Sequence, residues 1–383
     1  MRATVQRRVP AAVAAAALLT TIAACSGPPP IPVPTPTPEP PPPVAEDFAT
    51  ALQDAGVPGG ALAIRSDDTT VVYPVGDADA EGTPVTEDTL FAYRSITKSF
   101  VVTAALRLAD AGTLDLLEPS PDPVPGLAPA GATVRQLAAM TAGIPNYSAQ
   151  PGFAEAFLAE PERSWDDADL YAFAAGLPAV FPPGTDYEYS NTNTLVLARA
   201  IEHTVDDTWA EAVRELVTQP LGLSSVAYPG DAETLPAGAA RPFEADAGAA
   251  PEPLPVVRAS AFSAAGGLYG TAGDLVAWAE ALGTGALLDE TTFTRRTIAM
   301  SPTSTDPRSP LYDAYGLGIG RLGEWIGHTG NGLGYQALAM HHVETGTSVA
   351  IVLNATGADP DLPAHLLQAL APDILAPEDV DGS

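Results

Sequence analysis

A serine and a lysine three residues apart form the pair in this sequence that is best suited to chemistry. Ser95 and Lys98 enclose the stretch Ser95-Ile96-Thr97-Lys98, and the apolar run that follows is typical of a helix ending near Gly112. Side chains at positions i and i+3 of a helix lie on the same face. We therefore expect a hydroxyl beside an amine at a helix N-terminus, where the dipole favours a developing oxyanion.

Lys98 is the only lysine of the chain, and the other sixteen of its 17 basic residues are arginines. Arginine stays protonated in proteins, whereas a desolvated lysine can lose its proton and then accept one. Ser95 with Lys98 therefore predicts a nucleophile with a base beside it. The spacing by itself is a weak signal, because an exposed cation in the first turn of a helix would show the same pattern.

Two more polar clusters stand further along the chain. Tyr189-Ser190-Asn191 opens a helical pattern, and His328-Thr329-Gly330-Asn331 is expected in a Gly-flanked turn after a C-terminal strand. The order S-x-x-K, Y-x-N and H-T-G, with Gly266-Gly267 before the last, resembles the serine β-lactamase and penicillin-binding protein family, specifically its class C and DD-peptidase branch. The resemblance covers residues 46 to 373.

The resemblance implies a role for each member of these motifs. Ser95 would be the acylated nucleophile, and Lys98 and Tyr189 would share the general-base work. The backbone N–H groups of Ser95 and Asn331 would form the oxyanion hole. A structural alternative for Tyr189 is a buried residue that only supports the following helix.

The substrate-binding residues are also implied by the resemblance. Asn191 would hold the substrate amide, with Thr329 and Gly330 beside it. His328 takes the place that many relatives fill with lysine, so it would donate near the reacting carbonyl and, when protonated, attract a carboxylate. A structural turn histidine is the alternative. Two departures from the family pattern are Arg94 before the nucleophile, and Asn331 where the peptidases usually offer a hydroxyl.

The periodicity predicts the elements that position these motifs. We expect a helix at 46–55, a hairpin of 61–65 with 70–73, mainly helical patterns over 95–206, an irregular excursion at 229–255, a helix starting near Asp274, strands at 315–321, 324–328, 335–341 and 348–353, and a helix at 362–370. Strands at both ends of the chain predict an α+β fold. Its antiparallel sheet would be flanked by helices and built from residues 45–92 and 256–376, with residues 93–255 inserted as a mainly helical lobe. The resemblance implies that this is the β-lactamase/transpeptidase-like fold.

The N-terminal residues have the features of an export signal. Arg2, Arg7 and Arg8 precede an apolar run, and Ile22-Ala23-Ala24-Cys25 resembles the lipobox of bacterial lipoproteins. We expect residues 1–24 to be a signal peptide and Cys25, the single cysteine, to carry the lipid. Residues 25–44 would form a stiff stalk, because eleven of the sixteen residues at 28–43 are proline. Simple secretion with cleavage nearby is the alternative.

Composition limits the partners. A formal net charge of −30 argues against nucleic acid, which needs clustered Lys and Arg. An acidic stretch at 77–88 only superficially resembles a calcium loop, and His341 and His342 are adjacent on a strand, so they point to opposite faces. No metal or other cofactor is expected. The membrane would be contacted only through the lipid, and we expect a monomer.

These observations predict a lipid-anchored serine acyl hydrolase on the wall-facing side of the cytoplasmic membrane. The resemblance implies a D-alanyl-D-alanine carboxypeptidase acting on peptidoglycan stem peptides, with β-lactams as acylating inhibitors. One alternative is an esterase that uses the same residues on small acyl esters. The other is a catalytically silent surface protein that binds wall peptides or penicillin.

Overall fold

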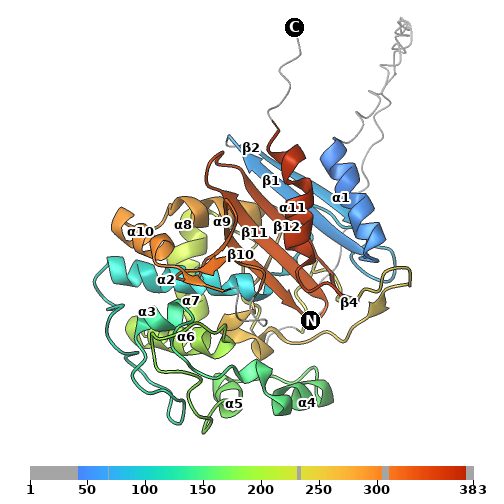
Figure 1. Ribbon diagram of the computed structural model, residues 1–383. Coiled ribbons are helices and arrows are strands. Elements are labelled where there is room, and N and C mark those ends of the chain that lie inside the picture. The colour runs from blue at the N-terminus through green and yellow to red at the C-terminus, as the bar shows by residue number, and fades with distance from the viewer. Residues whose placement is uncertain (1–41, 68, 231–233, 304–309, 377–383) are drawn as a thin grey trace, which may run out of the picture. The chain divides into compact units, whose positions relative to one another are not determined.

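The largest element of the fold is an eight-stranded antiparallel sheet in the order β2-β1-β12-β11-β10-β9-β8-β7. The computed structural model describes residues 42–67, 69–230, 234–303 and 310–376. Strands β1 (Gly59–Ser66) and β2 (Thr69–Gly76) come from the N-terminal part and pair with each other, and β1 also pairs with β12 (Ser348–Leu353) from the C-terminal part (Figure 1). The prediction of one antiparallel sheet built from both ends of the chain is confirmed.

The remaining strands of the sheet are β7 (Ser301–Pro302), β8 (Ala314–Tyr315), β9 (Gly320–Leu322), β10 (Trp325–Gly332) and β11 (Tyr335–His342). The expected C-terminal meander is therefore present, but the H-T-G motif lies within β10 and not in a turn. The turn comes later, at Leu333 and Gly334, which both have positive φ. Such two-residue turns match the twist of antiparallel strands.

Both faces of the central strands are buried, and side chains alternate between them as the two-residue period of a strand requires. In β1, Ala61 and Ala63 pack into the core shared with the helical part, whereas Leu62 packs into a second core. Strand β11 repeats the pattern with Ala339 on the first face and Leu338 on the second. The small residues face the helices that carry the site.

Helices cover each face. Helices α1 (Pro43–Asp54) and α11 (Leu362–Ile374) contact each other on one face, and α9 (Ala272–Thr284) packs on the other (Figure 1). Helix α2 (Thr97–Asp110) lies beyond, against α6 (Asn191–Val205). The other helices are α3 (Val134–Ala138), α4 (Pro151–Ala159), α5 (Asp167–Ala172), α7 (Trp209–Val213), α8 (Gln219–Leu221) and α10 (Glu290–Ile298).

Short elements connect these layers. The stretch 229–255, expected to be an irregular excursion, contains β4 (Phe243–Glu244) and β5 (Glu252–Pro253) in its described part, and β4 pairs with β13 (Ala355–Thr356). Strand β3 (Phe91–Ala92) pairs with β6 (Tyr269–Gly270) just before the nucleophile segment. The boundaries expected for the two lobes stay a prediction.

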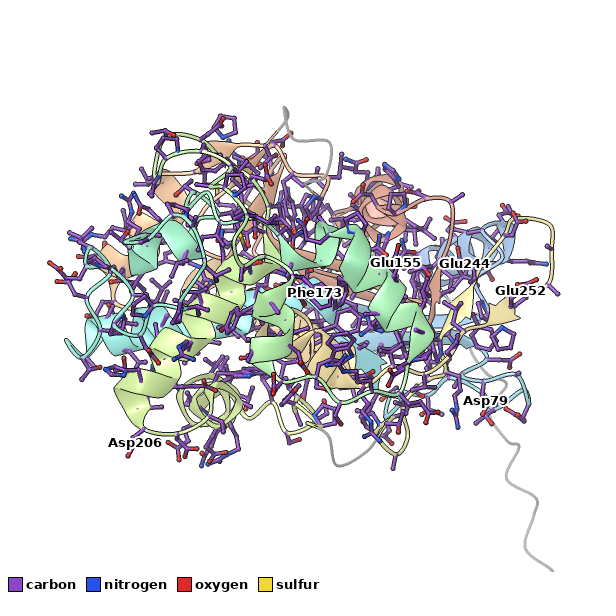
Figure 2. All side chains as sticks on the ribbon, turned by 90° about the horizontal axis from the view of Figure 1, so that it is seen from below. Asp79, Glu155, Phe173, Asp206, Glu244 and Glu252 are labelled. Atoms are coloured by element: carbon purple, nitrogen blue, oxygen red, sulfur yellow. The ribbon has the colours of Figure 1, made fainter. Side chains whose placement is uncertain are left out.

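Exposed acidic side chains occur on several elements of the fold. Figure 2 labels Glu155 on α4, Asp206 after α6, and Glu244 and Glu252 on β4 and β5, all of which are exposed. No helix within the described ranges is both long and apolar enough to cross a bilayer. Residues 1–41, including Cys25, lie outside the described residues, so the predicted signal peptide, lipid attachment and most of the stalk do too.

Candidate active site

Ser95 sits in a 3-10 turn, η1 (Arg94–Ile96), immediately before α2. The preceding residue, Arg94, has a φ of 50°, which is unusual for a residue with a side chain. Its buried guanidinium donates from Nε to the carbonyl of Gly332 at 2.8 Å and from Nη2 to that of Leu333 at 3.1 Å. The Arg94 side chain therefore ties the nucleophile turn to the β10–β11 turn and does not line the pocket beside Ser95.

Lys98 lies one turn into the helix with its amine directed at the nucleophile. Its Nζ is 2.9 Å from Ser95 Oγ and donates to the carbonyl of Ala265 at 2.6 Å. The side chain is fully buried, and this burial holds the pKa of Lys98 well below its usual range, because desolvation disfavours the charged amine. A buried amine in contact with a hydroxyl is the arrangement a proton acceptor needs.

Tyr189 comes from the residues just before α6 and reaches the same point. The centre of its ring lies 5.1 Å from Lys98 Nζ, and its buried hydroxyl is close enough to the side chain of Ser95 to interact with it. Burial raises the pKa of Tyr189 well above its usual range, and the interaction with Ser95 opposes this to a lesser extent. The phenol is therefore neutral in the resting protein.

Strand β10 forms the opposite wall. Strand β9 pairs with β10 only from Trp325 to Gly327. Beyond Gly327 no strand formed by the described residues covers that edge of β10, which lies against η1. A methyl group on Gly330 would collide with the carbonyl oxygen of Tyr93 and lie 3.2 Å from the backbone nitrogen of Ser95. Glycine at this position lets the two backbone segments approach each other.

His328 lies behind the pocket and is not part of its described lining. It is fully buried, with Nδ1 at 2.7 Å from the carbonyl oxygen of Thr329 and Nε2 at 3.0 Å from the hydroxyl of Tyr315. Burial, together with the nearby charge of Lys98, lowers the pKa of His328 to about 3. The imidazole is therefore neutral at ordinary pH and supports β10 from behind the pocket wall.

These elements enclose a pocket of about 300 Å³ beside the nucleophile. It contains six of the eight residues predicted for catalysis and binding, Lys98 and His328 being buried behind it. The described lining consists of Ser95, Asn146, Tyr189, Asn191, Pro310, Thr329, Gly330, Asn331, Ala337, Pro360, Asp361, Pro363 and Ala364. Of these residues, Asp361 is the only one that carries a charge.

Asn191 presents an acceptor to this pocket. Its Nδ2 donates to Ser148 Oγ at 2.7 Å, and its backbone N–H donates to Asn146 Oδ1 at 3.2 Å. Its Oδ1 is buried and has no hydrogen-bond partner in the described structure. A substrate N–H is the donor that would satisfy this oxygen.

Sequence reasoning missed several residues of this site. Asn146 lies in a Pro/Gly-containing loop, and Asp361 precedes the last helix, positions that show no periodic signal. Tyr315, which fixes His328, reads as an ordinary strand residue. Only the conjunction of a polar loop residue with a nearby motif could have suggested Asn146. Within the residues that the structure places, no three His, Cys, Asp or Glu side chains are grouped so that they could hold a metal ion.

Known proteins resemble this chain in both sequence and structure. The family model described as Beta-lactamase matches residues 44–371. Penicillin-binding protein 4 of Amycolatopsis lactamdurans is 30% identical over 55% of this chain and 55% of its own length. Esterase EstB of Burkholderia gladioli is 32% identical over 47% of this chain and 50% of its own. The chain thus spans about half the length of the curated relatives it matches.

A solved structure covers more of the chain. The D-stereospecific amidohydrolase from a Streptomyces species superposes with a TM-score of 0.72 at 26% identity, over 85% of this chain and 97% of its own. The expected fold class is confirmed by this likeness together with the observed sheet. The assignment of individual residues to catalytic roles stays a prediction.

Proposed function

The chain belongs to the β-lactamase family of serine hydrolases, and on that premise we propose that it cleaves an amide or ester bond through an acyl-Ser95 intermediate. The observation that carries the proposal is the contact of 2.9 Å between Ser95 Oγ and the buried amine of Lys98. In the first step Oγ bonds to the substrate carbonyl carbon and its proton passes to the base. The bond to the leaving group then breaks as the leaving group takes up that proton, and water later releases the acyl group.

Lys98 is the better proton acceptor of the two candidates. Burial lowers the pKa of Lys98, which favours the neutral amine that can accept a proton, whereas it raises the pKa of Tyr189 and so disfavours the phenolate. Tyr189 then relays the proton toward the leaving group as a neutral phenol. This assigns the two residues consecutive roles.

The backbone N–H groups of Ser95 and Asn331 are proposed as the oxyanion hole. The close approach of Gly330 to the backbone of Ser95 supports this, because it brings the uncovered edge of β10 beside the nucleophile. Backbone donors held in place before the reaction stabilise the tetrahedral intermediate without reorganisation. Asn191 would accept the substrate N–H through its unpartnered Oδ1.

We propose peptides or amides of D-amino acids as the substrates. D-alanyl-D-alanine stem peptides, which end in a free carboxylate, are one form of this class, and D-amino acid amides, which carry a free ammonium, are the other. The likeness to a D-stereospecific amidohydrolase and to a penicillin-binding protein supports this. Esterase activity on small acyl esters is the second candidate. It is favoured by the likeness to an esterase and by the absence of a cation from the described pocket lining, since an ester needs no carboxylate recognition.

Acylation of Ser95 by a fluorescent penicillin and turnover of p-nitrophenyl acetate test the proposal. We expect an adduct on the peptide that contains Ser95, measured by mass spectrometry, and hydrolysis that disappears in Ser95→Ala. Release of D-alanine from a D-Ala-D-Ala peptide tests the carboxypeptidase form. A folded protein that forms no adduct and hydrolyses neither substrate would instead match the silent binding protein.

The substitution Lys98→Arg tests the base. It keeps the positive charge but removes the titratable amine, so we expect kcat/KM for p-nitrophenyl acetate to fall by about 10²–10⁴-fold, the usual contribution of a positioned base. Arg107→Lys, near the other end of α2, is the matched control and should retain activity. Wild-type activity in folded Lys98→Arg would remove Lys98 from the mechanism.

We also propose that the protein is exported and held by a lipid on Cys25, at the outer face of the cytoplasmic membrane. The basic residues near the N-terminus, the apolar run and the lipobox-like tetrad support this proposal. The proline-rich residues that follow would keep the folded part away from the lipid surface and near a cell-wall substrate.

A further inference from the structure

We infer that Asp361 makes the pocket selective for substrates that carry an ammonium group near the scissile bond, and unfavourable for those with a free carboxylate there. The inference rests on the proposed acyl transfer at Ser95 and names the substrate class of that site. It follows from the position and partners of Asp361, from the charges around it, and from the unpartnered acceptor of Asn191.

Asp361 immediately precedes α11 and lines the same pocket as Ser95 and Asn331. It is half-buried, and its Oδ1 accepts a hydrogen bond from the backbone N–H of Leu311 at 3.2 Å. No ion pair of Asp361 occurs among the described residues. A carboxylate held by one neutral donor keeps its negative charge available to a ligand.

Among the described residues, the basic groups nearest to the pocket do not cancel this charge. Arg94 is turned away and donates to two carbonyls, and His328 is neutral because its pKa lies at about 3. Lys98 is fully buried behind Ser95, and burial favours its uncharged form. The described surface that a substrate meets is thus neutral except for one carboxylate.

The N-terminus of α11 also faces the pocket, and a helix N-terminus ordinarily favours an anion. In α11, however, the first turn has few backbone N–H groups that are free to bind an anion. Pro363 has no N–H, and the N–H groups of Ala364 and His365 donate to the carbonyl of Asp361. The Asp361 carboxylate at this helix end already provides the negative charge that the dipole favours. At this helix end a substrate carboxylate would therefore face repulsion from Asp361 and find few free backbone N–H groups.

The side chain of Asn191 independently indicates that the pocket fits a hydrogen-bond donor. Its Oδ1 is buried without a partner and lines the pocket, while its Nδ2 is engaged by Ser148. Two oxygen acceptors, one neutral and one anionic, therefore lie in one small pocket. An ammonium or an N–H-rich group is the chemistry that fits them.

The ammonium could belong to either side of the scissile bond. On the acyl side it would be the free amine of a D-amino acid amide or of an N-terminal D-residue. On the leaving side it would be a cationic amine that departs. Both share the chemistry that Asp361 recognises, and substrates can be built to separate them.

Four substrates of similar size test the inference on the full-length protein. D-alanine p-nitroanilide carries the ammonium on the acyl side, and N-acetyl-D-alanine 2-aminoethylamide carries it on the leaving side. N-acetyl-D-alanine p-nitroanilide is neutral, and N-acetyl-D-alanyl-D-alanine carries a carboxylate. We expect kcat/KM for one cationic substrate to exceed that for both the neutral and the carboxylate substrate by about tenfold or more, mainly through a lower KM.

The variant Asp361→Asn keeps the size of the side chain and the acceptor for Leu311. We expect it to lower the ratio of kcat/KM between the cationic and the neutral substrate about tenfold, and Asp361→Glu to restore part of that ratio. A general loss of activity would lower kcat/KM for both substrates equally and would leave this ratio unchanged. Glu155→Gln, which removes an exposed carboxylate on α4, is the matched control and should leave the ratio unchanged.

Preference for the carboxylate substrate, or an unchanged ratio in Asp361→Asn, would overturn the inference. Turnover of p-nitrophenyl acetate by the wild-type protein distinguishes failure of the proposed role of Asp361 from failure of the proposed function. If that ester is hydrolysed and no cationic preference is found, only the role of Asp361 fails. If neither that ester nor any of the four substrates is hydrolysed, the proposed function fails.

Discussion

Besides Arg94, three basic side chains are buried in the described region near the nucleophile, and burial lowers the pKa of each. Arg296 contacts α2 through Thr103 Oγ1 at 2.9 Å, and its pKa is lowered to about 9. Lys98 and His328 are shifted in the same direction, and His328 is additionally affected by the charges of the other two. Burial therefore lowers the pKa of all three groups, and repulsion by neighbouring charges adds to the shift only at His328.

His328 should make the protein less stable in acid. Its pKa is about 3 in the folded state and near 6.5 in the unfolded state, so between these values only the unfolded chain binds the proton. The free energy of unfolding should therefore fall as the pH is lowered, by about 3 kcal/mol from this residue at pH 4 relative to pH 7. Urea unfolding at both pH values measures this loss.

The variants His328→Asn and His328→Gln should show a smaller loss of stability between pH 7 and pH 4, even if both are less stable at pH 7. His365→Asn, which alters an exposed histidine on α11, should keep the wild-type difference. An unchanged pH difference in both His328 variants would mean that the imidazole is already protonated in the folded state.

Strand β10 is the element on which the geometry of the pocket depends. It continues through the H-T-G residues to Gly332, and its uncovered edge meets η1 at Gly330. The same elements are joined on the other side by Arg94, whose guanidinium binds the carbonyls of Gly332 and Leu333. The strand and the nucleophile turn are therefore positioned as one unit.

Replacing Gly330 by alanine should push β10 and the nucleophile turn η1 apart. The added methyl group would meet the backbone of Tyr93 and Ser95, and neither segment can yield without moving the nucleophile. We expect kcat/KM for p-nitrophenyl acetate to fall about 100-fold, since a misplacement of about 1 Å can cost this much, and the free energy of unfolding to fall by about 1–3 kcal/mol.

Gly273→Ala serves as the comparison for that variant. Gly273 lies in the first turn of α9 with nothing closer than 3.9 Å to an added methyl group, and alanine favours helix by about 1 kcal/mol. The Gly273→Ala variant should keep the wild-type kcat/KM, and its free energy of unfolding should rise slightly. Normal activity in Gly330→Ala would show that β10 and η1 can move apart without consequence.

The two ends of the described chain meet in one sheet, and a single buried side chain links them. Asn354, just after β12, accepts from the backbone N–H of Gly59 at 2.9 Å and donates from Nδ2 to the carbonyl of Asp77 at 3.0 Å. Pairing of β1 with β12 joins residues nearly 300 positions apart in sequence. The folded part beginning with α1 therefore needs both ends to complete its core.

Lipid attachment is a prediction about the whole protein, because Cys25 lies outside the folded part that the structure describes. If Cys25 carries the lipid, the wild-type protein should partition with membranes and incorporate labelled palmitate when expressed in a bacterium. Cys25→Ser should abolish the label and move the protein to the soluble fraction, with the esterase activity per molecule unchanged. Ser26→Ala is the neighbouring control. Membrane association that persists in Cys25→Ser would contradict the anchor.

Local information in the sequence was sufficient for much of this architecture. The period-two pattern indicated most of the long strands, and the confirmed sheet and fold class follow from where those strands fall along the chain. Lys98, three residues after Ser95, indicated a hydroxyl beside an amine because that spacing places two side chains on one helical face. The order of this pair with the Y-x-N and H-T-G motifs then connected it to acyl transfer through the family resemblance. The strands and each motif can be recognised from neighbours in the chain.

Tertiary structure decided the properties that depend on distant residues. Gly330 and Gly332 suggested a turn, but the approach of η1 explains why glycine stands at position 330 within a strand. The neutral state of His328 arises from burial and from charges on α2 and α10, and the place of Asp361 in the pocket arises from how α11 packs on the sheet. Desolvation and electrostatic potential are sums over a neighbourhood in space, and only the folded chain defines that neighbourhood.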